Sequence, residues 1–473
     1  MNLLLAVVLP SVLGAQCVAW LFPAPAPGRA VLILGYGILF GLLTVAMMLR
    51  VLDASGIVLT FFAGATPLAL LVLAFACLQF FQRGSTVTPR TNPGAFGLSR
   101  PQLALFVFFL ILIDLRILSL ALELVWRPLF PWDATMHWAT KARVWFDAQA
   151  IVPFVDNLRW LELGGEGVYT DHHPGYPITT PLLQLWLSLA LGRWDESLMN
   201  LPWLLCLTGL ALAFYGQARA AGGSALAAII FTYLLVSLPL LNTHVALAGY
   251  SDLFLGAFYA AALMAFHNWS VSRQPAQAVL ALVFALYCPL IKNEGFFWLL
   301  TFLPALVVVL LPWRRAMTLL CGAVLILVLQ LAFLPPDLVI AGNSLGDLKL
   351  KFHTGVFSGI ATSIWVQDNW HLLGFLLPAL TFLVVLSGRG VAARYRSIGV
   401  ALLSAIALLL SLFLFTRHSL GAVRFSSLGR ISLQLVPSLM FLAMLFWQDV
   451  SRRQLYGRFR HVPAQDEVPP PSS

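Results

Sequence analysis

Charged residues are scarce in this chain of 473 residues. Asp, Glu, Lys and Arg together make up 10% of the sequence, whereas 60% of it is hydrophobic and the mean hydropathy is +0.89. Soluble globular proteins are about half apolar and about one quarter charged. This composition therefore excludes a soluble globular protein and predicts an integral membrane protein.

Cysteine is also rare. The five cysteines lie far apart within apolar runs, and no CxxC pair occurs, so the sequence indicates neither a disulfide framework nor a zinc site. A groove pattern of basic and aromatic residues is absent too, and we expect no nucleic-acid partner. The net charge of +9 comes mostly from arginines in predicted cytoplasmic loops, where it reports orientation and contact with anionic membrane lipids.

Strand-like alternation of apolar and polar residues is missing as well. Apolar runs of about 17 to 25 residues recur instead, and each is long enough to cross a membrane as a helix. We predict an all-α polytopic bundle of about thirteen transmembrane helices. The runs cover about residues 3–22, 29–49, 57–81, 102–125, 197–217, 222–240, 253–268, 276–290, 295–312, 316–334, 372–387, 397–416 and 431–448.

The arginines predict the orientation of this bundle, because short cytoplasmic loops collect Lys and Arg. The loop with Arg83, Arg90 and Arg100 contains no acid, and other arginine-rich turns fall on the same side if the run 178–192 does not cross. That run is short for a span, so we expect an interfacial or re-entrant helix. The amino terminus then lies outside and the carboxyl tail inside. Three outer loops follow: 126–196, 335–371 and 417–430.

The first outer loop is unusually long and rich in aromatic residues, which suggests a function. Within it, Trp138, Ala142 and Trp145 recur at spacings of four and three. This predicts a helix lying flat on the bilayer with one apolar face. Asp133 directly precedes that helix and is either an N-cap or a carboxylate fixed at the membrane surface, where a general base for a lipid-linked substrate would be needed.

A histidine pair later in the same loop raises the question of a metal. Asp171, His172 and His173 are too close in sequence to form a strong ligand set alone. The neighbouring prolines and glycine indicate a rigid turn instead. We therefore expect no cofactor, and a divalent metal is a possibility that the sequence does not indicate.

Five stretches occur in an order that resembles the GT-C superfamily of integral-membrane glycosyltransferases. They are FPWDATMHW, HPGYPITTPLLQLWLSLALG, HVALAGYSDLFLGAFYAAAL, PLIKNEGFFWLL and GRISLQLVPSLMFLAML. The pattern is most similar to the bacterial group of protein O-mannosyltransferases and lipid A aminoarabinose transferase. The resemblance covers about residues 102–448, which would form the catalytic module, preceded by additional helices in 1–101 and followed by a basic, disordered cytoplasmic tail in 449–473.

The resemblance implies transfer of a sugar from a polyprenyl-phosphate carrier to an acceptor on the outer face, with inversion at the anomeric carbon. The family's aspartate in the first outer loop activates the acceptor or organises the site, and Asp133 stands at the matching position. Ala134 and Thr135 follow it in place of a second acid. This argues against a metal-dependent mechanism, because one aspartate supplies few oxygen ligands. An acid after the next outer hairpin matches Asp252, which could alternatively cap its helix.

Basic residues at the predicted outer boundary suit the phosphate of such a carrier. Arg430 matches the family's arginine that contacts this phosphate, and Arg424 is the second candidate. Arg417 and His418 belong to the same basic loop, which opposes the positive-inside trend and so favours an anionic ligand. Lys292, with Glu294 two residues on, is a further candidate partner of a lipid phosphate, or both are simply solvated. The remaining predicted substrate-binding residues are His137, Lys141, His173 and Tyr176.

The sequence therefore predicts a glycosyltransferase whose partners are a polyprenyl-phosphate-sugar donor, a lipid, glycan or protein acceptor, and membrane lipids. Its active site would face the periplasm from a bacterial inner membrane. Two alternatives stay open. One is a multi-pass transporter or flippase of lipid-linked sugars, although no internal repeat is visible and the polar residues gather on one face. The other is a polysaccharide polymerase or ligase.

Overall fold

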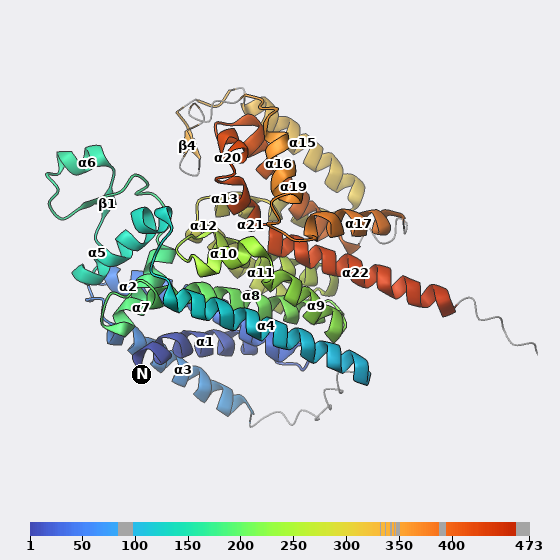
Figure 1. The fold of residues 1–473 in the computed structure, drawn as a ribbon, viewed down its shortest axis with the longest axis horizontal. Helices are drawn as coiled ribbons and strands as arrows, with labels where there is room; N and C mark the ends of the chain where they lie inside the picture. The colour runs from blue at the N-terminus through green and yellow to red at the C-terminus, as the bar shows by residue number, and fades with distance from the viewer. Residues whose placement is uncertain are drawn as a thin grey trace, which may run out of the picture.

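The structure is a computed structural model, and it confirms an all-α membrane protein (Figure 1). It describes residues 1–83, 98–331, 333–335, 337–340, 343–344, 346, 351–386 and 394–459. The predicted cytoplasmic loop around Arg90, part of the predicted outer loop 335–371 and the tail after Phe459 lie outside the described residues.

Helices form most of the described chain. The first group is α1 (Asn2–Leu21), α2 (Arg29–Ala54), α3 (Phe61–Arg83), α4 (Arg100–Trp126), the π-helix η1 (Ala134–Ala139), α5 (Thr140–Ala148), α6 (Asn157–Glu162) and α7 (Thr179–Leu191). The second group is η2 (Leu198–Asn200), α8 (Leu201–Ala220), α9 (Ala225–Val236), α10 (Pro239–Ala246), α11 (Asp252–Ser272), α12 (Pro275–Ile291), α13 (Glu294–Leu300) and α14 (Phe302–Leu310). The last group is α15 (Trp313–Leu331), α16 (Val356–Trp365), α17 (Leu373–Leu386), α19 (Arg396–Phe415), α20 (Ser419–Val423), α21 (Leu428–Leu433) and α22 (Val436–Phe459).

Strands are short and lie in the loops. β1 (Phe154–Val155) pairs in parallel with β2 (Tyr169–Thr170), and Phe154 is opposite Tyr169. β3 (Val339–Ile340) pairs antiparallel with β4 (Asn343–Ser344). The β1–β2 pair and α6 form an arm that projects from the end of the bundle near α5 (Figure 1).

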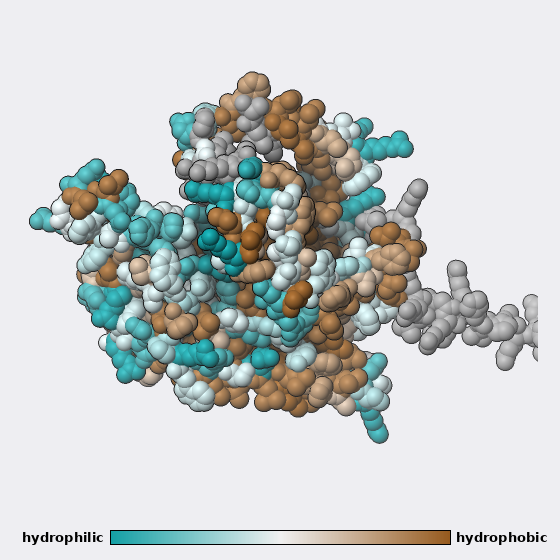
Figure 2. All heavy atoms as spheres, turned by 45° about the horizontal axis from the view of Figure 1, so that its top comes forward, coloured by the Kyte–Doolittle hydropathy of each residue, from teal (hydrophilic) through white to brown (hydrophobic). Residues whose placement is uncertain are grey.

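Seven of the described helices are long and apolar enough to span a membrane. These are α1, α2, α3, α4, the η2–α8 segment, α15 and α19. The pair α9 and α10, which is bent by 60° at its break, would make an eighth. Every predicted apolar run coincides with a helix or a helix pair. Hydrophobic residues cover broad areas of the surface, whereas hydrophilic residues gather at the end formed by α5 and α6 (Figure 2).

Helix α11 is the centre of the bundle. Its residues from Asp252 to Asn268 are all buried, and it packs against α8, α12, α19 and α22. Alanine is frequent on this helix, and Gly256 adds a further small residue, which allows neighbouring helices to approach closely. The amino-terminal helices belong to the same packed body, since the Tyr36 hydroxyl on α2 donates to the carbonyl of Ala261 at 2.6 Å.

The helix predicted to lie flat on the bilayer packs into the protein instead. It consists of η1 followed by α5, and Trp138, Ala142 and Trp145 on its apolar face are buried. This face is covered by protein, including α7. The prediction of a bilayer-facing surface was therefore wrong, because periodicity defines an apolar face but not what covers it.

The run 178–192 forms α7, which is buried from Thr179 to Ala190. It contacts the ends of two other helices: Trp186 Nε1 donates to the Ala6 carbonyl at 2.9 Å, and the Thr179 hydroxyl donates to the Leu290 carbonyl at 2.6 Å. An exposed interfacial helix is thus excluded. At the carboxyl end, α22 continues to Phe459, so the beginning of the predicted disordered tail 449–473 is helical.

Candidate functional site

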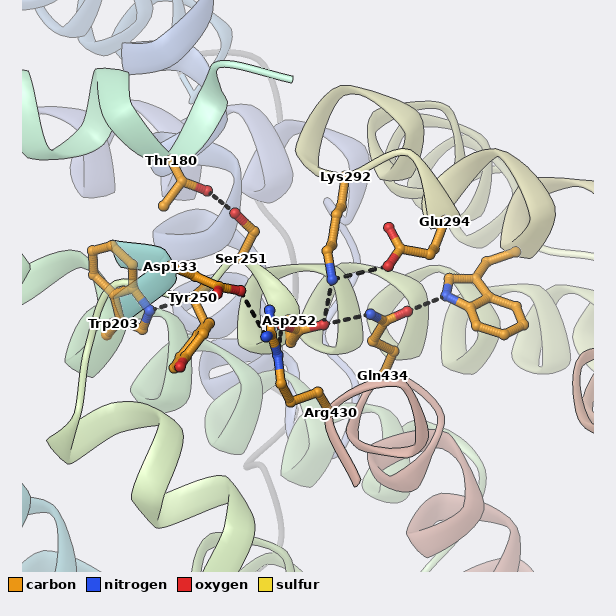
Figure 3. Close-up of polar contacts among 11 residues, drawn as sticks. Asp133, Thr180, Trp203, Tyr250, Ser251, Asp252, Lys292, Glu294, Arg430 and Gln434 are labelled. Carbon is orange, nitrogen blue, oxygen red and sulfur yellow. Dashed lines mark hydrogen bonds and ion pairs between the residues drawn. The ribbon is translucent and has the colours of Figure 1, made fainter. Parts of the chain in front are cut away.

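Four chain segments that are distant in sequence bring charged side chains together at one end of α11 (Figure 3). Asp133 comes from the start of the η1 segment, and Asp252 is the first residue of α11. Lys292 and Glu294 flank the turn between α12 and α13, and Arg430 lies on α21. We call these five residues the charged network.

Asp252 is the centre of the charged network, and its side chain is fully buried. Lys292 Nζ lies 2.8 Å from Oδ1, and Gln434 Nε2 donates to the same oxygen at 2.6 Å. Arg430 Nε lies 3.2 Å from Oδ2. Ser251, rather than Asp252, occupies the N-cap position of α11. The carboxylate therefore binds two cations and does not act as a helix cap.

Asp133 does not cap its helix either. Its side chain makes no capping hydrogen bond, and Oδ2 accepts from Arg430 Nη1 at 2.7 Å. Arg430 thus joins the two aspartates, and its guanidinium lies 4.2 Å from the centre of the Tyr250 ring. Trp203 Nε1 donates to the Tyr250 carbonyl at 2.9 Å and fixes this loop. A carboxylate held by these contacts has a defined position at the end of the bundle.

Lys292 and Glu294 form an ion pair of 2.9 Å. Burial on its own would lower the pKa of Lys292, but Asp252 and Glu294 outweigh it and hold this pKa above its ordinary value. The amine is therefore an ammonium ion at neutral pH. These two residues are not simply solvated, because Lys292 is 7% exposed and both side chains are paired.

Two glycines allow the segments to meet. A Cβ at Gly295 would lie 2.0 Å from the Cys288 carbonyl oxygen, so α13 packs directly on the last turn of α12. Gly249 has a φ of +124°, and a Cβ there would lie 2.2 Å from the Cβ of Ala134. The loop before α11 can therefore approach the η1 segment beside Asp133 only because this position lacks a side chain.

Asp171, His137 and Lys141 form a second polar cluster. Asp171 Oδ1 lies 2.6 Å from His137 Nδ1, and Oδ2 lies 2.6 Å from Lys141 Nζ. The same carboxylate accepts from the backbone N–H of His173 at 3.1 Å. Burial acts to raise the pKa of Asp171, but its hydrogen bonds to Lys141 and His173 lower it below the ordinary value. The cluster fixes the turn that follows β2.

That turn places two aromatic rings beside the charged network. His173 and Tyr176 stack with ring centres 4.7 Å apart, and Tyr176 stacks on Trp138 at 5.3 Å. Burial lowers the pKa of His173, so its ring is neutral near pH 7. Flat faces of this kind suit a sugar ring or another planar or amphipathic group.

The charged network, except for the fully buried Asp252, and these rings line a cavity of about 1070 Å³. The polar side of the cavity is lined by Asp133, Lys292, Glu294, Arg430, His173 and Tyr176. The apolar side is lined by residues of α13, α15 and α19, including Phe297, Trp298, Val328, Leu408 and Phe415. Arg417 and His418, which follow the end of α19, are also in the lining. One cavity thus combines fixed charges with an extended apolar wall.

The structure brings most of the predicted site residues together. Asp133, Asp252, Lys292, Glu294 and Arg430 form one network, and His173 and Tyr176 line the same cavity. His137 and Lys141 do not line the cavity; both pair with Asp171, which accepts from the backbone N–H of His173. Arg424 directly follows α20; its side chain is exposed and lies outside the cavity lining.

Sequence reasoning missed Gln434 and Tyr250. Gln434 lies one helical turn after Arg430, and its Oε1 accepts from Trp298 Nε1 at 2.6 Å. The spacing of four could have indicated a shared face with Arg430. Tyr250 directly precedes Ser251 and Asp252, but an uncharged residue beside an apolar run gives little signal. Its role as a partner of the Arg430 guanidinium required the fold.

Among the described residues, no group of three or more His, Cys, Asp or Glu side chains is arranged to hold a metal ion. Comparison with protein-family models, curated proteins and solved structures finds no match for this chain.

Proposed function

We propose that this protein is a membrane glycosyltransferase of the GT-C type. It transfers a sugar from a polyprenyl-phosphate donor to a lipid, glycan or protein acceptor, with inversion, at the periplasmic face of a bacterial inner membrane. The observation that carries this proposal is a cavity whose polar side holds fixed carboxylates and cations and whose other side is an apolar wall. A donor made of a sugar, a phosphate and a prenyl chain also combines a polar, charged part with a long apolar part.

The proposed reaction is a single displacement in which the acceptor itself is the nucleophile. Asp133 removes the proton from the acceptor, whose atom then forms a bond to the anomeric carbon while the bond from that carbon to the phosphate oxygen breaks. The electron pair leaves with the phosphate, and positive charge in the cavity stabilises the developing negative charge. His173 and Tyr176 offer faces against which the sugar can stack.

The proposal also includes the arrangement of the helices in the membrane. About thirteen helices would cross the membrane, with residues 102–448 as the catalytic module. The charged network would then lie at the outer ends of its helices, because the start of α11 and the end of α12 both face outward in that topology. A prenyl chain could enter from the outer leaflet along α19.

Transport of a lipid-linked sugar is the second candidate. The 60° bend between α9 and α10 favours it, because interrupted helices carry the substrate sites of many transporters. A lipid-linked-sugar polymerase or ligase would use a similar cavity. These candidates differ in outcome: a transporter moves the donor unchanged, whereas a transferase or a polymerase releases the carrier phosphate.

The test is release of polyprenyl phosphate by the purified full-length protein. A panel of polyprenyl-phosphate sugars is supplied in detergent with membrane extract as the source of acceptor. We expect release by the wild type and a loss of roughly 100-fold or more in Asp133→Asn, in line with removal of a general base. Asp147→Asn is the matched control, because Asp147 forms an exposed pair with Arg143 in the same segment.

The monodispersity and thermal unfolding of each variant show whether it is folded. Release by the wild type and by Asp147→Asn, but not by a folded Asp133→Asn, supports the proposal. Full activity of Asp133→Asn would show that Asp133 is not the general base. If the wild type releases nothing from any donor, but moves a labelled donor across proteoliposomes, the protein is a transporter.

A further inference from the structure

A second cavity lies at the other end of the bundle from the charged network. It has a volume of about 980 Å³ and is formed by the α1–α2 loop, the start of α2, and one side of α4, α8 and α9. Trp203, near the start of α8, contacts the loop before Asp252, whereas Arg219, near the end of α8, lines this cavity. From Trp203 to Arg219 the helix rises about 24 Å. We call this space the α4–α8 cavity, and among the described residues it shares no lining residue with the first cavity.

The α4–α8 cavity has the depth of one membrane leaflet. Its lining on α4 extends from Phe106 to Ile117, and its lining on α8 extends from Thr208 to Arg219. Each stretch rises about 16 Å, and one leaflet contributes about 15 Å of hydrocarbon. Most of the lining is apolar, and α4 lies on the outside of the bundle (Figure 1). A lipid chain from one leaflet therefore has access to this cavity and the length to fill it.

Two arginines place positive charge at one end of the α4–α8 cavity. Arg29 donates through Nε to the Phe22 carbonyl and through Nη2 to the Ala19 carbonyl, and Arg219 Nη1 donates to the Gly223 carbonyl. The ion pairs of the described residues include neither arginine. Carbonyl groups leave the positive charges in place, and each guanidinium has five N–H groups, so donors remain for a ligand.

Gly28 brings the two arginines to the same place. It has a φ of +75°, and a Cβ there would lie 2.6 Å from the Cβ of Arg219. The α1–α2 loop therefore contacts the stem of Arg219 directly, and Arg29 is the next residue. Gly28 is also the N-cap of α2, a helix of 26 residues without a side-chain cap. The positive end of the dipole of this helix thus adds to the charge of the arginines.

The carboxylate of Asp114 lines the α4–α8 cavity far from these arginines. Helices α4 and α8 run antiparallel, since Ser197 before α8 donates to the carbonyl of Arg127 after α4 at 2.9 Å. The ring centres of Phe106 and Tyr215 lie 6.4 Å apart and mark one level of the cavity. Asp114 lies about 12 Å along α4 from this level, and Arg219 about 6 Å along α8 in the opposite direction. The charges therefore orient an amphiphile with its anionic group toward the arginines.

We propose that the α4–α8 cavity binds one anionic phospholipid from the leaflet opposite the charged network. Its phosphate is bound at Arg29 and Arg219, and an acyl chain lies along α4 and α8 toward Asp114. A zwitterionic lipid also carries an ammonium group, which the arginines repel, so this site favours a headgroup whose only charge is negative. The inference does not depend on the proposed function, because the charged network takes no part in it.

The test compares binding of phosphatidylglycerol and of phosphatidylcholine, with the same acyl chains, to the purified full-length protein. The protein is delipidated in detergent, and native mass spectrometry counts the bound lipids at increasing lipid concentration. We expect one tightly bound phosphatidylglycerol, with an affinity roughly tenfold or more above that for phosphatidylcholine, because two arginines attract it. Glycerol phosphate, which is the headgroup without chains, should not displace it at equal concentration.

The first variant is Arg29→Gln with Arg219→Gln, which should lose the preference for phosphatidylglycerol. Arg100→Gln with Arg315→Gln is the matched control, because it removes the same charge from exposed arginines at the starts of α4 and α15, outside the lining. It should keep the preference. Leu110→Trp fills the cavity without a change of charge and should weaken binding of both lipids. Leu110 is 40% exposed, so this change does not overpack a buried position.

Thermal unfolding shows whether each variant is folded. Equal affinity for the two lipids in the wild type, or an equal loss of preference in the Arg100 and Arg315 control, would overturn the proposal. So would unchanged binding in a folded Leu110→Trp, which tests the site even if the change of Arg29 and Arg219 unfolds the protein. Displacement by glycerol phosphate would show a site for a free anion instead of a lipid. None of these results depends on whether polyprenyl phosphate is released.

Discussion

At the residue scale, Asp252 compensates the charge of the buried Lys292 and of the partly buried Arg430. It is 0% exposed and binds both Lys292 and Arg430, and Gln434 completes its hydrogen bonds. The attraction within such a buried pair is largely offset by the cost of removing both ions from water. Loss of the Asp252 carboxylate leaves Lys292 with Glu294 alone and Arg430 with Asp133 alone, so part of that cost is no longer compensated.

We therefore predict that Asp252→Ala lowers the free energy of unfolding by about 3 to 5 kcal/mol, the usual effect of breaking a buried ion pair. Thermal unfolding of the purified protein in detergent measures the change as a lower midpoint. Asp147→Ala removes an exposed pair and should alter stability by only about 0 to 1 kcal/mol. Equal midpoints for the two variants would contradict the central role of Asp252.

The residues of the charged network could be selected from the sequence because charge is rare in this chain. Asp133, Asp252 and Arg430 each lie at the border of an apolar run, where a charged side chain is costly and therefore indicates a function or a partner. Their mutual contacts could not be predicted, because these depend on how distant helices pack. Arg424, the second candidate after Arg430, lies outside the cavity lining, whereas Arg417 of the same loop lines the cavity. Which of these side chains faces the cavity depends on how a short loop turns, and only the fold shows it.

At the scale of elements, the turn between α12 and α13 sets the position of Lys292 and Glu294. Gly295 makes this turn possible, because a Cβ there would collide with the carbonyl of Cys288 at 2.0 Å. Both contacting groups belong to helix backbones, so neither can rotate away. A methyl group must therefore push the start of α13 away from α12.

We predict that Gly295→Ala separates Lys292 from Asp252 and reduces release of polyprenyl phosphate as strongly as loss of a site residue. The variant should also unfold at a lower temperature, because overpacking costs about 1 to 3 kcal/mol. Gly322→Ala on α15 is the matched control, since nothing lies within 4 Å of a Cβ at that position. Wild-type activity in Gly295→Ala would show that the turn can relax without moving Lys292.

The helices themselves were largely predictable, but their surroundings were not. The period of Trp138, Ala142 and Trp145 correctly indicated one buried face. It gave no information on whether lipid or protein buries that face, because both are apolar. The same limit applied to α7, whose length suggested an interfacial or re-entrant helix: its burial from Thr179 to Ala190 excludes the exposed interfacial position but not the re-entrant one.

At the scale of the whole molecule, the proposed mechanism depends on which side of the membrane holds the charged network. The arm with α6 and the network lie at the same end of the bundle in the predicted topology, and Glu166 is an exposed residue of that arm. Gln274 is exposed in the short turn between α11 and α12, at the opposite end of α11 from Asp252. These two positions therefore report on the two faces.

We predict that a membrane-impermeant maleimide labels Glu166→Cys in intact cells above the background of the parent protein. Gln274→Cys should be labelled only after the membrane is permeabilised. Both changes replace exposed residues, so they should leave the fold unaltered. The reverse pattern would place the charged network in the cytoplasm. A transferase would then require a donor on the cytoplasmic side, and the arginine-rich turns would face outward against the positive-inside rule. Labelling of the two positions thus tests two inferences together: the membrane orientation predicted from the arginines, and sugar transfer on the outer face proposed from the cavity.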